Sequence, residues 1–153
     1  MSDENILTIE RLQESLKKKI AVSEYLEITQ ERVNRFAEAT GDFQWIHVDP
    51  ARAATDSPFK GAIAHGFLTL SLLSVLHNET VKIENVRFGI NCGTNFVRFL
   101  APVKVGAQIR AHFTPAEIKQ LPDCVQIVWS ITVEAKKSLA PVMMAEWIIR
   151  YYK

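Results

Sequence analysis

The sequence predicts an α+β fold in which an antiparallel sheet is wrapped around one buried central helix. The stretch from Gly66 to His77 is apolar on every side when drawn as a helix, which is typical of a helix covered all around. The second half of the chain alternates apolar and polar residues, as half-buried strands do. Because no helical pattern separates these strands, consecutive strands are expected to pair antiparallel.

The first forty residues are expected to hold two helices. An amphipathic pattern covers residues 8–19, and residues 1–20 are expected to form an N-terminal helical extension. A short strand is expected over residues 25–28. Thr29 is a suitable N-cap for the second helix, and Gly41 suits the left-handed residue that ends it.

The buried helix over residues 66–77 is followed by segments with the strand pattern. Alternation is strictest over residues 125–133 and 143–151. The expected strands are residues 81–88, 95–100, 109–113, 125–133 and 143–151. Turn signals lie at residues 92–95, 105–106, 121–123 and 140–141. One buried helix against one antiparallel sheet is the hot-dog arrangement, and 153 residues fit a single domain over residues 1–153.

Composition excludes several classes of function. Eighteen basic and 17 acidic residues give a net charge of +1, which argues against nucleic acid as the main partner. The most apolar stretch, residues 67–76, is too short to cross a bilayer. The N-terminus lacks the pattern of a secretory signal, and Cys92 and Cys124 fit no metal spacing. We therefore expect a cytoplasmic protein in which both cysteine thiols are reduced and lie at ordinary half-buried strand positions.

An acid, a histidine and a second acid lie within eight residues, at Asp42, His47 and Asp49. A spacing of five residues separates two side chains on a helix or a strand, so Asp42 and His47 can converge only if the chain turns between them. Gly41 and Pro50 are compatible with such a turn. A carboxylate and an imidazole of near-neutral pKa could then share proton transfers with a substrate.

Residue types alone leave other interpretations of these residues open. Asp42 could form an Asx-turn after the helix, and His47 could be a satisfied core residue, an interpretation that the residue types favour. With Asp49 and His65 they would also suit zinc or iron in number, but no spacing fixes that geometry. His65 is expected to pack beside the start of the buried helix. Asp49 is expected to cap the short helix that follows Pro50.

Residues 40–50, Thr-Gly-Asp-Phe-Gln-Trp-Ile-His-Val-Asp-Pro, resemble the signature of the MaoC-like family, which includes (R)-specific enoyl-CoA hydratases. The sequence is especially similar to the NodN-like branch. The resemblance continues through residues 57–59, 63–68 and 96–106, so that it spans roughly residues 20–150. The combined pattern is specific for the family, and less so for one substrate.

The resemblance implies a hydratase/dehydratase that acts reversibly on enoyl or 3-hydroxyacyl thioesters without metal or cofactor. It places the catalytic pair on Asp42 and His47, which hold a water between them, and the oxyanion donor on the backbone N–H of Gly66. The start of a helix also suits a developing negative charge on physical grounds. A supporting serine falls on Ser74, which could equally be a small polar residue packed in the helix.

The resemblance further implies a CoA or acyl-carrier thioester as substrate and a homodimer in which sheets pair edge to edge. Neither nucleic acid nor membrane is expected as a partner, and fatty acid metabolism is the expected setting. Gln44 and Trp45 stand where most characterised hydratases of the family have Asn-Pro, a change that bears on acyl specificity and activity. Two alternatives on the same fold are an acyl-CoA thioesterase and a non-catalytic acyl-binding protein.

Overall fold

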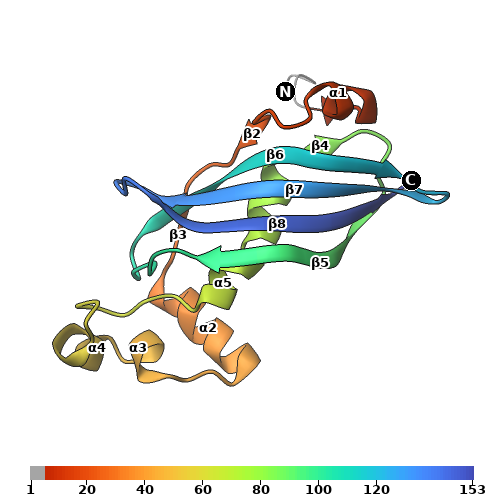
Figure 1. Cartoon of the computed structure of the whole chain (residues 1–153). Helices are drawn as coiled ribbons and strands as arrows, with labels where there is room; N and C mark the ends of the chain where they lie inside the picture. The colour runs from red at the N-terminus through yellow and green to blue at the C-terminus, as the bar shows by residue number, and fades with distance from the viewer. Residues whose placement is uncertain (1–5) are drawn as a thin grey trace.

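The computed structural model describes residues 6–153 as a long antiparallel sheet with one helical layer against it. Helices α5 (Gly66–Ser71) and α6 (Leu73–Thr80) follow one another behind the sheet. Helices α2 (Gln30–Thr40), α3 (Trp45–Val48) and α4 (Pro50–Asp56) gather beyond the end where α5 begins (Figure 1). This is the α+β arrangement that the sequence predicts.

Four long strands make up most of the sheet: β5 (Phe88–Phe99), β6 (Gln108–Gln120), β7 (Cys124–Ala135) and β8 (Pro141–Tyr152). The order is β2-β6-β7-β8-β5, and the short strands β2 (Ala21–Val22) and β3 (Leu26–Glu27) both pair with β6. Strands β1 (Ile6–Leu7) and β4 (Lys82–Ile83) form a separate parallel pair. Strand β5 is therefore an edge strand, and it is exposed along almost its whole length.

The core lies between the helical layer and the inner face of the sheet. Leu68, Leu73 and Leu76 of the helices are almost fully buried there. The large side chains facing them from the sheet are buried at strand positions that alternate, as the strict pattern of β7 and β8 predicts. They are Phe113, Val125, Ile127, Trp129, Ile131, Met143 and Ile149.

The predicted helix boundaries around the second helix are confirmed. Thr29 accepts a hydrogen bond from the Arg32 backbone N–H (3.2 Å) at the start of α2, and Gly41 ends that helix with a φ of 75°. Asp49 caps α4 by accepting from the Arg52 backbone N–H at 3.0 Å. These local signals fix the helix ends around the segment that holds Asp42 and the short helix α3 that carries His47.

Several expected elements differ in extent. Helix α1 covers only Ile9–Glu14 rather than residues 8–19, and residues 1–5 of the expected extension lie outside the described part of the chain. The buried helix is divided at Leu72 and continues to Thr80. It is not covered on every side: one stripe of its surface, made of Phe67, Ser71, Ser74 and Asn78, is exposed.

The predicted turn at residues 92–95 is wrong, because these residues continue strand β5. The register against β8 shifts between Asn91 and Gly93 and again between Thr94 and Phe96, so the glycine and asparagine signals mark bulges. Gly93 has a φ of 127°, which a glycine adopts without strain. Cys92 is exposed on β5 and Cys124 is buried on β7, so neither is half-buried as expected.

Among residues 6–153, no helix has the length and apolar character needed to cross a bilayer.

Candidate active site

A turn between α2 and α3 brings Asp42 toward His47. After Gly41 ends α2, the carboxylate oxygen Oδ1 of Asp42 accepts a hydrogen bond from the backbone N–H of Gln44 at 3.3 Å, which is an Asx-turn. Trp45 occupies the first position of α3, under the guanidinium of Arg52 (4.3 Å to the ring centroid). The Asp42 side chain itself remains 53% exposed, so its carboxylate is accessible to solvent.

The imidazole of His47 is held in one orientation by the main chain. The ring is only 7% exposed, and its Nδ1–H donates to the backbone oxygen of Ile63 at 2.7 Å. This bond leaves Nε2 as the acceptor nitrogen. Burial is the main cause of a lowered pKa at His47, so the ring is neutral at pH 7. A neutral ring with an unprotonated Nε2 can accept a proton.

His65 contacts both members of the predicted catalytic pair. It precedes Gly66 at the start of α5, and its ring stacks on that of His47 with centroids 3.9 Å apart and planes at 25°. Its Nε2–H donates to the backbone oxygen of Asp42 at 3.0 Å and lies 3.9 Å from the Asp42 carboxylate. Within residues 6–153, the buried Nδ1 of His65 has no hydrogen-bond partner. His65 therefore fixes Asp42 relative to His47.

The side chains of Asp42, His47 and His65 offer nitrogen and oxygen atoms within 4.8 Å of one another, which raises the question of a metal site. A zinc ion needs nitrogen lone pairs that converge on one point about 2.1 Å away. Each lone pair lies in the plane of its ring, and the two rings are stacked rather than convergent. Asp49, the fourth ligand considered from the sequence, is occupied as the cap of α4. The arrangement suits a proton-transfer group better than a metal-ligand set.

A cavity of about 350 Å³ opens beside His47 and Gly66. Its wall is mainly apolar and comes from α5, the loop before it, the end of β5 with the segment that follows, and β8; it includes Phe59, Phe99, Leu100, Pro102 and Val142. No hydrogen bond to the Gly66 backbone N–H is found within the described residues. A Cβ at Gly66 would lie 3.1 Å from the Phe99 ring. The cavity thus offers an apolar slot with one backbone donor near an imidazole.

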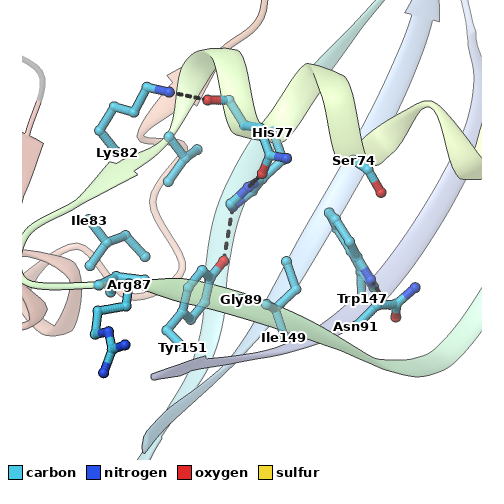
Figure 2. A pocket seen from close by; sticks show the side chains of 13 residues that line it. Ser74, His77, Lys82, Ile83, Arg87, Gly89, Asn91, Trp147, Ile149 and Tyr151 are labelled. Atoms are coloured by element: carbon cyan, nitrogen blue, oxygen red, sulfur yellow. Dashed lines mark hydrogen bonds between the residues drawn. The ribbon is translucent and has the colours of Figure 1, made fainter. Parts of the chain in front are cut away.

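Ser74, the fourth predicted site residue, lies away from the catalytic pair. It is eight residues beyond Gly66, roughly 12 Å along the helix axis. It lines a second cavity, of about 410 Å³, together with His77, Trp147 and Tyr151 (Figure 2). Three of the four predicted site residues, Asp42, His47 and Gly66, come together at the start of α5, and Ser74 does not join them. Sequence reasoning assigned only packing to His65, although a histidine next to the predicted oxyanion donor was a usable signal.

Comparison with known proteins agrees with this architecture. Residues 11–136 match the family described as MaoC like domain. The chain belongs to the MaoC-like family. The MaoC-like chain is 48% identical over 134 residues to the 3-hydroxyacyl-thioester dehydratase Z of Mycobacterium tuberculosis H37Rv, with 87% of this chain and 88% of that protein covered.

A second MaoC-like relative is nodulation protein N of Rhizobium meliloti, 41% identical over 131 residues, with 84% of this chain and 81% of that protein covered. The predicted likeness to the NodN-like branch is thereby confirmed. Among solved structures, the (R)-hydratase from A. caviae involved in PHA biosynthesis superposes with a TM-score of 0.71 at 25% identity, covering 88% of this chain and 96% of that one. The predicted hot-dog fold is confirmed by this similarity.

Proposed function

We propose that this protein is a hydratase/dehydratase that adds water reversibly to trans-2-enoyl thioesters of coenzyme A, with Asp42 and His47 as the catalytic pair. The observation that carries the proposal is the placement of the Asp42 carboxylate close to His47, whose side chain lines the same cavity as Gly66. The relative named 3-hydroxyacyl-thioester dehydratase Z and the solved (R)-hydratase structure support it.

The reaction needs a water molecule activated at C3 and a proton delivered at C2 of the enoyl group. A water between the two side chains is oriented by the Asp42 carboxylate and gives a proton to Nε2 of His47 as its oxygen bonds to C3. The C2–C3 double bond shifts electrons onto the thioester oxygen, and the Gly66 N–H stabilises the resulting enolate. The imidazolium of His47 then returns the proton to C2, which restores the neutral ring.

The same groups serve the reverse reaction. In dehydration, neutral His47 removes the proton from C2 of the 3-hydroxyacyl thioester, and the hydroxyl at C3 leaves as water after receiving that proton. His65 positions the pair, because one imidazole both stacks on His47 and bonds the Asp42 backbone. The apolar wall of the cavity offers hydrocarbon contacts to the acyl group beside the reacting carbons.

The decisive experiment follows crotonyl-CoA with purified protein, through the loss of the absorbance of its conjugated thioester. Wild type is expected to hydrate it, and Asp42→Asn is expected to lose hydration while folding normally. Asparagine keeps an oxygen that accepts from the Gln44 N–H, so the Asx-turn is retained. Hydration by Asp42→Asn at the wild-type rate contradicts the role of Asp42.

A parallel assay for free thiol separates the rival activity. A thioesterase releases coenzyme A from an acyl-CoA, whereas a hydratase leaves the thioester intact. Thiol release without loss of the double bond contradicts the hydratase assignment. Tight acyl-CoA binding with neither reaction, at any chain length, supports a non-catalytic acyl-binding protein instead. A matched control is His112→Gln, because His112 lies on β6 against Glu134 and contributes nothing to this site.

The exposed edge of the sheet supports a homodimer. Among residues 6–153, no strand pairs with the outer side of β5, which also carries large exposed apolar side chains, a combination that monomers rarely leave uncovered. These side chains are Phe88, Ile90, Phe96 and Phe99. A second copy pairing along β5 covers them. Sedimentation equilibrium is expected to give twice the monomer mass of 17.3 kDa, and a monomer at micromolar concentration contradicts the pairing.

A further inference from the structure

The short helix that carries His47 is held by bonds from outside itself. Helix α3 has four residues, and the last four carbonyls of an α-helix have no partner within it. The Trp45 carbonyl accepts from the N–H of Asp49, the residue that ends the helix, at 3.0 Å. The His47 carbonyl accepts from the side-chain amide of Gln30 at 2.7 Å. The position of His47 therefore depends in part on a residue that lies 17 places earlier in the chain.

Ile63 and Gln30 hold α3 from two different segments of the chain. The N–H of Ile63 donates to the Ile46 carbonyl at 3.1 Å, and its carbonyl accepts from Nδ1 of His47 at 2.7 Å. Gln30 is the first residue of α2, the helix that leads through its C-cap to Asp42. The Gln30 amide thus links the helix before one member of the catalytic pair to the helix that carries the other.

The chemistry of the contact fixes which end of the Gln30 amide faces His47. A backbone carbonyl can only accept a hydrogen bond, so the NH₂ group of Gln30 must face it. The same NH₂ group also donates to Oδ1 of Asn34 at 2.9 Å, one turn further along α2. Both N–H donors of the amide are therefore used, one within α2 and one to α3.

The oxygen of the same amide shows that this orientation has a cost. Oε1 of Gln30 is buried, and no hydrogen-bond partner for it is found among residues 6–153. Buried acceptors without a partner are uncommon in folded proteins, because their desolvation is not offset. A glutamine that served only as a surface residue of α2 would turn this oxygen to water. The side chain is thus placed for the two bonds that it donates.

We propose that Gln30 is a positioning residue of the hydratase site, which holds the backbone of His47 so that Nε2 faces the water shared with Asp42. The inference rests on the proposed function, because it concerns the catalytic pair of that reaction. Gln30 does not line the cavity beside Gly66 and acts only through the His47 backbone. Without its amide, the imidazole keeps its bond to Ile63, but α3 loses its link to α2.

Gln30→Met tests this role in crotonyl-CoA hydration. Methionine has a similar length and helix propensity but no N–H donor. The value of kcat is expected to fall about tenfold, since misplacing a catalytic group by about 1 Å can cost about 10²-fold. KM is expected to change little, because Gln30 does not line the cavity proposed to bind the thioester. An unchanged kcat, or a loss that lies in KM alone, overturns the inference.

Asn34→Ala is the matched control, because it removes the other partner of the same amide and leaves the bond to His47. Its kcat is expected to stay at the wild-type value, and an equal fall in both variants would assign the effect to the start of α2 and overturn the inference. The wild-type protein reports on the proposed function separately. If wild type does not hydrate crotonyl-CoA, the proposed function is contradicted and the inference falls with it. If wild type and Gln30→Met hydrate it equally fast, only the role of Gln30 is contradicted.

Gln30→Glu gives a readout that a general loosening of α2 would not produce. A carboxylate of the same shape only accepts, so it repels the His47 carbonyl, whereas its protonated form regains one donor. Burial beside a carbonyl oxygen raises the pKa of such a carboxyl. The ratio of kcat for Gln30→Glu over wild type is therefore expected to rise about threefold between about pH 8 and about pH 5.5. The same ratio for Gln30→Met is expected to stay constant, and a Gln30→Glu ratio that does not rise overturns the hydrogen-bond role.

Discussion

The start of α5 buries two histidines, His47 and His65, whereas the end of α6 buries one, His77, and the rings of His47 and His77 meet very different surroundings. At the start of α5, His47 bonds the backbone of Ile63 and stacks on His65 beside the exposed carboxylate of Asp42. At the end of α6, His77 is bonded to Tyr151 and enclosed by aromatic rings. Burial lowers the pKa of both rings, so both are neutral at pH 7.

The difference lies in the hydrogen-bond partners of the two rings. His47 donates through Nδ1 to the backbone oxygen of Ile63, which leaves Nε2 unprotonated and able to accept a proton. His77 has partners at both nitrogens, since Nε2 lies 2.9 Å from the Tyr151 hydroxyl and Nδ1 lies 3.5 Å from Oδ1 of Asn78. The ring at the start of α5 is therefore suited to proton transfer, whereas the ring at the end of α6 is part of a buried hydrogen-bond network.

The largest expected effect comes from removing Nε2 of His47, the nitrogen that accepts a proton at the start of α5. His47→Gln is expected to lower kcat/KM for crotonyl-CoA about 10³-fold, the range of general base catalysis. The amide group of glutamine remains polar and can still bond Ile63, so circular dichroism is expected to match wild type. Activity of His47→Gln within a few-fold of its matched control, His112→Gln, would contradict the role of His47 as the catalytic base.

The second largest expected effect is a loss of folding stability at low pH, caused by His77 at the end of α6. The folded-state pKa of His77 is lowered from 6.5 to about 4, so the unfolded chain binds more protons than the folded one between these pH values. Its contribution to stability is complete above pH 6.5 and is lost as pH falls, by up to about 3 kcal/mol. Urea unfolding at a series of pH values measures this loss. It is expected to be smaller in the variant combining His77→Leu and Tyr151→Phe, and an equal loss would assign it to other groups.

A smaller effect is expected from one methyl group beside the amide of Gly66. In Gly66→Ala the new Cβ lies 3.1 Å from the Phe99 ring, which is half exposed and can shift. Alanine also favours the helix, so the unfolding midpoint is expected to change little. The methyl crowds the approach of the thioester, and kcat/KM is expected to fall about tenfold, a loss near 1.4 kcal/mol. Unchanged kcat/KM would argue against thioester binding at this amide.

The smallest expected effect is a shift of the acid limb of the pH–rate profile. Activity needs neutral His47, so kcat/KM falls with pH below the lowered pKa of His47, at a pH under 6.5. His65 contributes to that lowering through its proximity. In His65→Gln the limb is expected to move toward 6.5, whereas a purely structural role would lower activity at every pH alike. A limb that stays in place contradicts electrostatic coupling between the two rings.

Local signals in the sequence were sufficient for much of the fold. Alternation located β7 and β8, and the caps at Thr29, Gly41 and Asp49 fixed helix ends because each acts through neighbouring residues. Residues 92–95 carry the same turn signals but lie in β5. There the Asn91 side chain accepts from both the Gly93 N–H and the Trp147 indole, which holds the bulge against β8. That contact joins residues far apart in the chain, so spacing alone did not reveal it.

The candidate site likewise has a part that the sequence predicts and a part that only the packing of the chain reveals. The resemblance placed Asp42, His47 and Gly66, and the turn that their convergence requires is visible as glycine and an Asx-turn in the structure. The stacking of His65 on His47 joins the residue before α5 to a residue of α3 that is far from it in the chain, which no local pattern encodes. Ser74 was joined to the catalytic end by resemblance, while helix rise carries it to the other cavity.

A double-mutant cycle on Asp42 and His47 tests most directly whether the two side chains act on one water. Asp42→Asn, His47→Gln and the variant with both changes are compared in crotonyl-CoA hydration. If one water is shared by the two side chains, removing either abolishes its activation, and the double variant is expected to be no slower than the slower single variant. Losses that multiply, so that the double variant falls by the product of the two single effects, would show that Asp42 and His47 act independently and would contradict the shared site.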